Sequence, residues 1–353
     1  MKKIDYPNTA IYINKSFVNF FDCVDNIKKD TVFYFVDENI LGLYKSLFNN
    51  FHNIISIPSG EETKSIDYIN NIIKKLIELG ANRKTFIIGV GGGVTCDVAG
   101  FVASIFMRGV NFGFVPTTLL AMTDASFGGK NGINFNNIKN VLGVINEPDF
   151  VFIDYSFLKT LTHQEYLNGF AEIIKHACIS SSDLFYDLEK NADNYFKIIE
   201  NPGYSNFNKL HNMLCDSIKI KLDIVSSDRY ENGKRKSLNY GHTFGHAIEA
   251  EYGIPHGSAI SLGIVFSNIL SNKLGFLNED RLIRVNNLLE KYNLPVDVSM
   301  YEKKYLIKWI ERDKKSSDKN IDFVLLKDIG ISFVKPLSIQ KIIDGKKMVW
   351  NYK

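Results

Sequence analysis

The first half of the chain alternates short, nearly continuous apolar runs with amphipathic segments. The apolar runs cover residues 31–40, 84–93, 111–120 and 149–154. Such runs are expected for parallel strands that are buried on both faces of a sheet. Residues 66–81, between the first two runs, repeat apolar positions at helical spacing, and Gly80 is placed to end that helix. This order of strands and helices predicts an open α/β sheet.

Helical periodicity dominates after Thr160, and strand signals there are nearly confined to residues 321–326. The expected helices are 164–178, 205–227, 241–251, 257–274, 279–292 and 302–313. We therefore predict two domains. Residues 1–157 form an NAD-binding α/β domain with a mostly parallel, Rossmann-like sheet, and residues 158–353 form a mostly α-helical, metal- and substrate-binding domain. Ligand sites often lie between domains, so we expect the active site in the cleft between them.

Composition excludes several classes of protein. The chain has 353 residues, 45% of them hydrophobic, which is enough for two cores. Its 42 basic and 39 acidic residues give a net charge of +3, so no nucleic-acid or membrane partner is expected. The four cysteines are scattered, as is typical of a reducing compartment. The sequence shows neither a signal peptide nor a membrane-spanning run, so we expect a cytoplasmic protein.

A glycine-rich turn follows the strand expected at 84–93. Gly91–Gly93 stand consecutively before a helix-like segment, and Gly89 precedes them. Successive glycines let backbone N–H groups approach a pyrophosphate, and a helix N-terminus adds partial positive charge. The pattern is not GxGxxG, so it does not predict an ordinary Rossmann site. Dinucleotide binding is nevertheless favoured over a tight turn without a ligand, which usually needs fewer glycines.

Residues 115–140 crowd hydrogen-bonding side chains among paired glycines. They contain Thr117, Thr118, Asp124, Lys130, Asn134, Lys139 and Asn140. Carboxamides can form hydrogen bonds with hydroxyls, and lysines can bind phosphate, so these side chains suit a phosphorylated, polyhydroxylated substrate. Two neighbouring features are weaker signals. The segment 59–67 contains Glu61 and Lys64 and, considered by itself, is best interpreted as a charged surface loop. Arg108 follows an apolar helix and is by default a surface arginine.

Three of the seven histidines, His242, His246 and His256, lie within fifteen residues. The first two are spaced i, i+4 and share a helical face. Thr243 stands where a zinc metalloprotease needs a glutamate, which argues against that class. Residues 168–179 place Glu172, Lys175 and His176 among apolar positions. Glu172 with two histidines would make the three-ligand arrangement of catalytic zinc, although spacing alone leaves core histidines as an alternative.

Five motifs stand in the order and at the spacings of the dehydroquinate synthases. They are GGGVTCDVAGFVAS with FMRG, VPTTLLAMTDASFGGKNGIN, GFAEIIKHA, RKSLNYGHTFGHAIEAEYG and RDKK. The resemblance extends from about Asp37 to Lys315 and implies a homodimeric lyase that uses NAD and Zn2+ or Co2+. The implied reaction converts 3-deoxy-D-arabino-heptulosonate 7-phosphate to 3-dehydroquinate and phosphate, in the shikimate pathway of aromatic amino acid biosynthesis. Its implied steps are oxidation by NAD, phosphate elimination, reduction and intramolecular aldol closure.

The resemblance also implies roles for single residues. The metal ligands would be Glu172, His242 and His256. The NAD-binding positions would be Asp37, Glu61, Lys64, Gly91, Gly92, Gly93, Val94, Asp97, Thr117, Thr118, Lys130, Lys139, Phe157 and Thr160. The catalytic and substrate-binding positions would be Asp124, Lys130, Lys175, Lys221, Arg235, Asn239 and His246. The phosphate-side positions would be Lys139, Asn140, Asn239, His246, Lys314 and Lys315, with Arg108 reaching into the site of the partner subunit.

Two positions depart from the family pattern: Ser258 stands where glutamate is common, and Asn131 where threonine is common. Neither change removes a ligand or a lysine. Related sugar-phosphate cyclases differ near these loops, so a 2-deoxy-scyllo-inosose or 2-epi-5-epi-valiolone synthase is an alternative. A metal-dependent polyol dehydrogenase is another, although it needs no such set of lysines and would release NADH. Outside the enzymes, a silent binding protein is disfavoured by the intact ligand set.

Overall fold

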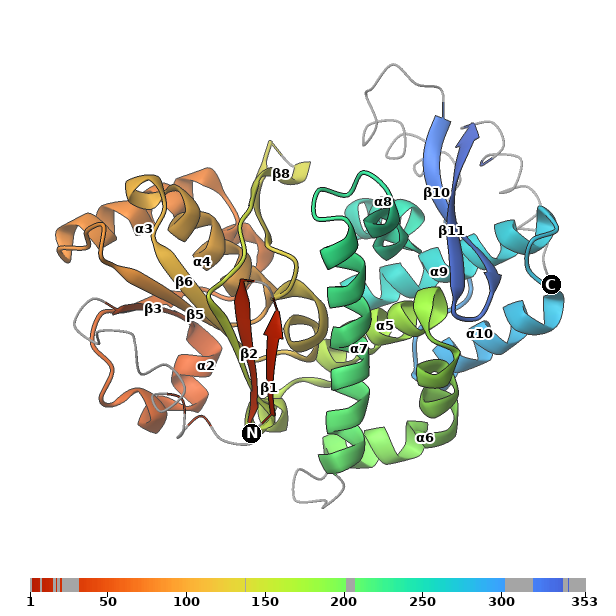
Figure 1. Ribbon diagram of the computed structural model, residues 1–353, viewed down its shortest axis with the longest axis horizontal. Helices are drawn as coiled ribbons and strands as arrows, with labels where there is room; N and C mark the ends of the chain where they lie inside the picture. The colour runs from red at the N-terminus through yellow and green to blue at the C-terminus, as the bar shows by residue number, and fades with distance from the viewer. Residues whose placement is uncertain are drawn as a thin grey trace. The chain divides into compact units, whose positions relative to one another are not determined.

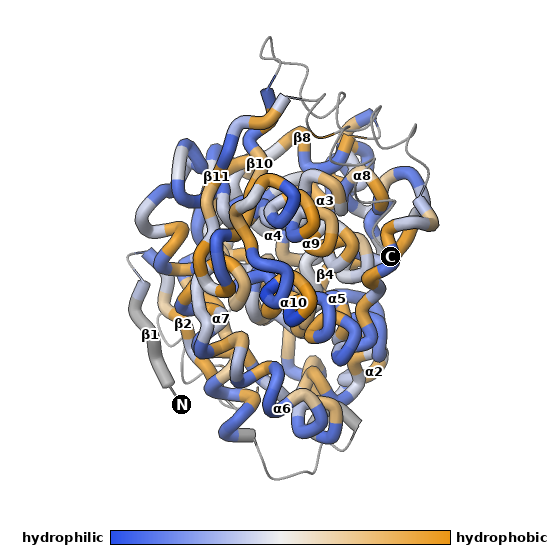
Figure 2. The backbone as a smooth tube through the Cα atoms, turned by 90° about the vertical axis from the view of Figure 1, so that its right-hand side faces the viewer, coloured by the Kyte–Doolittle hydropathy of each residue, from blue (hydrophilic) through white to orange (hydrophobic). Residues whose placement is uncertain are grey.

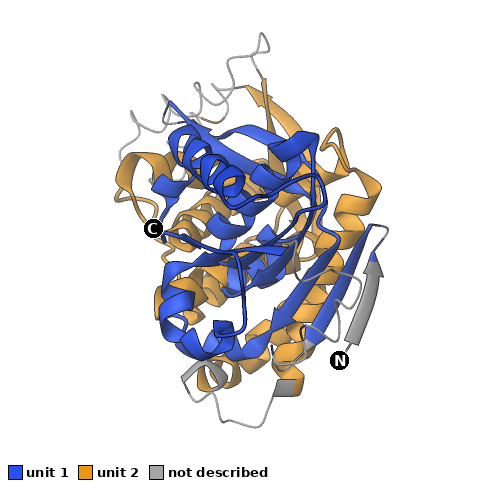
Figure 3. Ribbon diagram, turned by 90° about the vertical axis from the view of Figure 1, so that its left-hand side faces the viewer, with its two compact units in different colours: residues 1–162 blue, residues 163–353 orange. Residues whose placement is uncertain are grey.

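The computed structural model describes residues 2–6, 8–14, 17, 20, 32–136, 138–200, 207–301, 320–338 and 342. The chain divides into two compact units, Met1–Thr162 and His163–Lys353 (Figure 3). The first unit is α/β and the second is mostly helical, as predicted. None of the helices in the described ranges has the length and apolar content to span a bilayer. The assignment of NAD binding to the first unit and of metal binding to the second remains a prediction.

In its described part, the first unit is built on a seven-stranded sheet with the order β1-β2-β9-β6-β5-β3-β4 (Figure 1). The strands are β1 (Lys2–Tyr6), β2 (Thr9–Asn14), β3 (Val32–Asp37), β4 (Ile54–Ile57), β5 (Phe86–Gly91), β6 (Asn111–Pro116) and β9 (Phe150–Asp154). Neighbours are parallel, except that β1 and β2 are antiparallel. The four predicted strands correspond to β3, β5, β6 and β9.

Helices bury both faces of this sheet. Figure 1 shows α3 (Ile66–Glu78) and α4 (Gly93–Ile105) on one side and α2 (Glu38–Leu43) on the other. Every residue of β5 is buried, which explains its continuous apolar run. The strand expected at 31–40 is too long, because Asp37 accepts a hydrogen bond from Asn39 N and caps α2. The predicted helix at 66–81 ends at Glu78, and Gly80 follows with a φ of 80°.

The winding of the sheet reverses at β3. Strands β4 and β5 both pair with β3, one on each side, so the connections that leave β3 and β5 run in opposite directions. Open α/β sheets bind ligands beyond the carboxyl ends of strands at such a reversal. Asp37 ends β3, and Gly91–Gly93 follow β5. A hairpin of β7 (Lys130–Phe135) and β8 (Ile138–Ile145) packs on α4 nearby.

In the second unit, helices surround a central helix. They are α5 (His163–Ser180), α6 (Ser182–Glu200), α7 (Phe207–Ser227), α8 (His242–Tyr252), α9 (His256–Lys273) and α10 (Glu279–Lys291). Residues 259–271 of α9 are all buried, and α9 packs against α5, α8 and α10. The outer helices α6 and α7 alternate polar and apolar positions (Figure 2).

The prediction of this unit holds with one omission. Five expected helices correspond to α5, α7, α8, α9 and α10, whereas α6 was not predicted. The strand expected at 321–326 lies in β10 (Asn320–Asp328), which pairs with β11 (Ile331–Ser338). The helix expected at 302–313 lies outside the described residues.

Candidate active site

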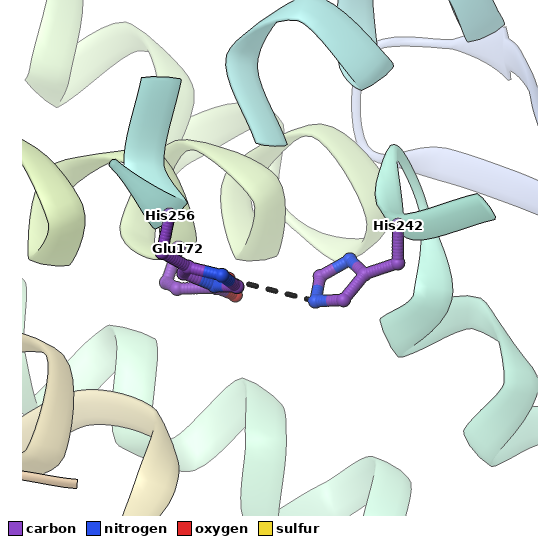
Figure 4. Close-up of side chains that lie close together, drawn as sticks. All are labelled: Glu172, His242 and His256. Carbon is purple, nitrogen blue, oxygen red and sulfur yellow. Dashed lines mark hydrogen bonds and ion pairs between the residues drawn. The ribbon is translucent and has the colours of Figure 1, made fainter. Parts of the chain in front are cut away.

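Glu172, His242 and His256 lie together in the second unit. Glu172 Oε1 is 3.1 Å from His256 Nε2 and 3.6 Å from His242 Nε2. Figure 4 shows the His242 imidazole pointing toward the carboxylate, which lies beside the ring of His256. One ligand atom from each residue lies within 4.8 Å of the others. Two imidazoles and a carboxylate form the donor set of catalytic zinc sites that leave a fourth position open. The three side chains therefore fit a divalent metal ion.

Close contacts between helices bring these side chains together. Glu172 lies in the middle of α5, while His242 and His256 are the first residues of α8 and α9. A Cβ on Gly257 would lie 2.6 Å from the Cα of Asn168 in α5. Only a glycine permits an approach this close. The start of α9 is therefore held against the helix that carries Glu172.

The Glu172 carboxylate is buried, with 1% of the residue exposed, and it forms an ion pair with the buried Lys175 through Oε2. A buried charge needs such a partner, since it has lost its hydration. Burial holds the pKa of His242 well below its usual value, and the Lys175 charge acts in the same direction. His242 is therefore neutral at physiological pH. Its Nδ1 lies 3.1 Å from the Tyr240 carbonyl, which assigns the proton to Nδ1 and leaves Nε2 free to bind metal.

His256 has a different electrostatic environment. Burial lowers its pKa, but hydrogen bonds to Glu172 and Glu249 outweigh that effect and raise the pKa to about 9. Glu249 Oε2 lies 3.5 Å from Nδ1, on the opposite side of the ring from Glu172. A carboxylate behind a ligating histidine is a common outer-shell arrangement in metal sites. Both carboxylates stabilise positive charge at this ring.

A second donor set overlaps the first. His246, Glu249 and His256 also place one ligand atom each within 4.8 Å of one another. His246 lies on the same face of α8 as His242, with ring centroids 5.0 Å apart, and it is exposed. We favour the set with Glu172, because a buried carboxylate gains more from a bound cation than an exposed imidazole does. His176 is in neither of these two sets: it is fully buried, and its Nδ1 lies 2.8 Å from Ser217 Oγ.

The expected substrate-binding residues of the second unit include buried cations. Lys175, Lys221 and Arg235 are buried, and Arg235 Nη1 donates to the Arg229 carbonyl at 2.6 Å. Asn239 is exposed, and its Nδ2 donates to Glu231 Oε1 at 2.5 Å. Glu231 was not among the residues predicted from the sequence. In the structure it has a positive φ of 61°, which is an unusual backbone position for a residue other than glycine. The substrate roles of these residues stay predictions.

In the first unit, the consecutive glycines form a tight cradle. A Cβ on Gly91 would lie 2.5 Å from Thr95 Oγ1 and 3.0 Å from Asp37 Cβ. A Cβ on Gly92 would lie 3.0 Å from Thr118 Cγ2. The glycine turn therefore meets Asp37 at the end of β3 and Thr118 after β6, beside the N-terminus of α4. Small residues at this reversal of the sheet leave backbone N–H groups accessible to a pyrophosphate.

Lys64 corrects the interpretation of residues 59–67 as a charged surface loop. Lys64 is only 4% exposed, and its Nζ lies 2.6 Å from both Asp97 Oδ2 and Asn140 Oδ1. Burial lowers the Lys64 pKa, but Asp97 and then Glu61 outweigh it and raise the pKa. The surface interpretation is wrong for Lys64, because a carboxylate and a carboxamide replace its hydration. It holds for Glu61, which is exposed.

The remaining expected site residues of the first unit differ in exposure. Lys130 and Lys139 are exposed, while Val94 and Asp124 are half-buried and Thr117 is buried. Phe157 lies in the aromatic core, 5.1 Å from Tyr44 between ring centroids, and Thr160 Oγ1 lies 2.9 Å from Tyr44 OH. Their cofactor roles stay predictions, and Lys314 and Lys315 lie outside the described residues.

Asn131, one of the two departures from the family pattern, has a structural role. It is buried, and its Nδ2 donates to the carbonyls of Gly129 and Asn146, each at 2.9 Å. A Cβ on Gly100 in α4 would lie 2.1 Å from Asn131 Oδ1. Asn131 therefore fixes the base of the β7–β8 hairpin to α4.

The chain is also similar to known proteins. A family model described as 3-dehydroquinate synthase N-terminal matches residues 54–168, and one described as 3-dehydroquinate synthase C-terminal matches residues 169–316. The 3-dehydroquinate synthase of Thermoanaerobacter pseudethanolicus is 36% identical over 333 residues, which cover 90% of this chain and 91% of that protein.

Two solved structures are also similar to the chain. The 2-epi-5-epi-valiolone synthase of Streptomyces hygroscopicus subsp. jinggangensis, with NAD+ and Zn2+ bound, has a TM-score of 0.85 at 23% identity and covers 100% of this chain and 99% of its own. A 2-deoxy-scyllo-inosose synthase complexed with carbaglucose-6-phosphate, NAD+ and Co2+ has a TM-score of 0.80 at 25% identity and covers 97% of this chain and 98% of its own.

Proposed function

This chain belongs to the 3-dehydroquinate synthase family, and from that premise we propose that it converts 3-deoxy-D-arabino-heptulosonate 7-phosphate to 3-dehydroquinate and phosphate. It is a phosphate-eliminating cyclase that depends on NAD and a divalent metal. The family models match residues 54–316 between them. The convergence of Glu172, His242 and His256 is the observation that supports assigning this function to a specific site.

We propose that these three residues hold the Zn2+ or Co2+ ion. A divalent metal bound by these residues would supply Lewis acidity for the reaction. Glu172 would contribute a carboxylate oxygen, and its ion pair with Lys175 offsets the cost of burying that group. The Tyr240 carbonyl fixes the His242 tautomer that offers Nε2. These contacts orient the ligands before any metal binds.

NAD would lie against Gly91–Gly93 in the first unit. NAD bound there would supply reversible hydride transfer and would not be consumed. The backbone N–H groups of the glycine turn and the N-terminus of α4 would face its pyrophosphate. Asp37 at the end of β3 and Thr118 after β6 border the same turn. Lys64 would add a positive charge that Asp97 holds in place.

The remaining site residues suit an anionic substrate. The buried Lys175, Lys221 and Arg235 would hold a carboxylate and hydroxyls, together with Asp124, Lys130 and Asn239. His246, Lys139 and Asn140 would serve the phosphate side. Ammonium and guanidinium groups are the usual partners of carboxylate and phosphate. A polyol dehydrogenase has no comparable need for these cations.

We also propose a cytoplasmic homodimer in which Arg108 serves the site of the partner subunit. Arg108 is exposed and ends the short 3-10 turn Phe106–Arg108 that follows α4, where its φ is 71° and that of Met107 is 52°. Left-handed backbone at residues other than glycine costs about 1 kcal/mol or more and is concentrated at functional positions. This strained turn supports a functional role for Arg108 over the default of a solvated surface arginine.

The proposed function is tested by accounting for phosphate and NADH together. Purified protein is incubated with the heptulosonate phosphate, NAD and Zn2+, and phosphate, 3-dehydroquinate and NADH absorbance are followed. We expect phosphate and 3-dehydroquinate in equal amounts, with no net NADH. Net NADH that matches turnover would indicate a polyol dehydrogenase instead. Turnover of glucose 6-phosphate alone would indicate a cyclase of the inosose type.

A further inference from the structure

The helix that carries His256 begins without a capping side chain of its own. Pro255 occupies the N-cap position of α9, and its ring has no oxygen that could accept a hydrogen bond. The first N–H groups of a helix have no partner within the helix. Serine, threonine, aspartate or asparagine usually fills the N-cap position because its side-chain oxygen accepts one of these N–H groups. Proline cannot do so.

Asn168 in α5 provides the missing acceptor from a neighbouring helix. Its Oδ1 accepts a hydrogen bond from Gly257 N at 2.8 Å, and the residue is 7% exposed. Its Nδ2 donates to Glu165 Oε1 at 3.2 Å, which turns Oδ1 toward α9. The missing side chain of Gly257 allows this approach, since a Cβ there would lie 2.6 Å from Asn168 Cα. The first turn of α9 is therefore capped by α5.

This cap lies one helical turn from a metal ligand. Asn168 and Glu172 are spaced i, i+4 in α5 and share one face of it. Asn168 binds the backbone of Gly257, and Glu172 Oε1 lies 3.1 Å from Nε2 of the adjacent residue, His256. One face of α5 therefore fixes both the backbone and the imidazole at the start of α9.

We propose that Asn168 is a positioning residue of the metal site, which holds His256 in ligand geometry before the metal binds. The proposal rests on the metal site proposed above. Loss of the cap frees the first turn of α9, so metal binding must then order that turn, and the apparent affinity falls with the population of the ordered state. Substitution of outer-shell partners in metal sites typically weakens metal binding by about 10- to 100-fold.

The test compares Asn168→Ala with Ser271→Ala. Ser271, near the other end of α9, also provides a side-chain acceptor for a buried backbone N–H of another element, that of Leu326 at 3.1 Å. The two variants lose the same kind of hydrogen bond, but only one is near the metal ligands. Metal affinity is measured by competition with a chromophoric chelator, and ligand geometry by the visible spectrum of the Co2+-loaded protein.

We expect Asn168→Ala to bind Zn2+ about 10- to 100-fold more weakly and to change the Co2+ spectrum. Ser271→Ala should lose stability and keep both the affinity and the spectrum. The double variant Asn168→Asp with Glu165→Gln keeps an acceptor for Gly257 N, and the amide at position 165 then donates to the carboxylate at position 168. It should therefore regain most of the affinity. If Asn168→Ala does not fold, Asn168→Ser replaces it, because the shorter hydroxyl stops short of Gly257 N.

Equal affinity and identical spectra in Asn168→Ala and Ser271→Ala would overturn the proposal. So would a double variant that folds but binds no better than Asn168→Ala. Glu172→Gln separates this failure from a failure of the metal site itself. If Glu172→Gln loses metal while Asn168→Ala does not, the cap proposal alone is wrong. If Glu172→Gln keeps full affinity, the proposed metal site is wrong as well.

Discussion

A Cβ atom on Gly263 would lie 1.8 Å from the carbonyl oxygen of Gly241. Helices α8 and α9 therefore meet backbone to backbone. Gly241 directly precedes His242, and Gly263 lies seven residues after His256, about two helical turns. This contact sets the separation of the two proposed histidine ligands, because it fixes the start of α8 against α9.

Gly263→Ala should destabilise the protein and weaken metal binding. The new methyl group would meet backbone, which cannot move aside as a flexible side chain can, and such overpacking typically costs about 1–3 kcal/mol or more. Gly42→Ala is the control, since a Cβ on that helical glycine meets no described atom within 4 Å, and it should leave stability unchanged or slightly raised. Urea unfolding midpoints and Zn2+ titrations measure both effects. A Gly263→Ala variant that matches Gly42→Ala in both measurements would contradict this account.

Lys64→Met should destabilise the first unit by about 3 kcal/mol, because it leaves the Asp97 carboxylate buried without its cation. The double variant Lys64→Met with Asp97→Asn removes the unpaired charge and should regain most of that stability. Both variants should bind NAD more weakly than the unmodified protein if these residues contact the cofactor as proposed. Urea unfolding and NADH fluorescence titration separate the two effects. Full NAD affinity in the double variant would reduce the pair to a structural role.

Arg108→Gly should abolish turnover without loss of stability, because glycine adopts the φ of 71° at that position freely. Mixed with Lys130→Ala, it should recover about a quarter of the unmodified activity, since half of randomly exchanged dimers are mixed and each of these has one intact site. Metal and NAD binding in each variant are the controls. No recovery after proven subunit exchange would show that Arg108 does not act in the partner's site.

Most elements with long, regular patterns were predictable from the sequence, with the 19-residue helix α6 as an exception, and short or long-range features were not. The apolar runs at β3, β5, β6 and β9 carried their own signal. β4 has only four residues, so its pattern is too short to recognise. Lys64 was interpreted as exposed because its partners Asp97 and Asn140 lie 33 and 76 residues away.

The candidate site shows the same division. Residue types suggested a carboxylate with two histidines, but Glu172 and His256 are 84 residues apart, and no local pattern shows that they meet. The family resemblance provided that pairing. Glu249 could have been found, because it lies seven residues after His242, on the same face of one helix. Asn168 could not, since its acceptor role depends on how α9 packs against α5.

The central claim is that Glu172, His242 and His256 hold the metal, and not the overlapping set of His246, Glu249 and His256. The most direct test is the metal content of two variants, His242→Ala and His246→Ala, each loaded with Zn2+, dialysed and measured by elemental analysis. His242 belongs only to the first set and His246 only to the second. We predict that His242→Ala loses bound metal and that His246→Ala keeps a full complement. Full metal in His242→Ala together with loss of metal in His246→Ala would contradict the account.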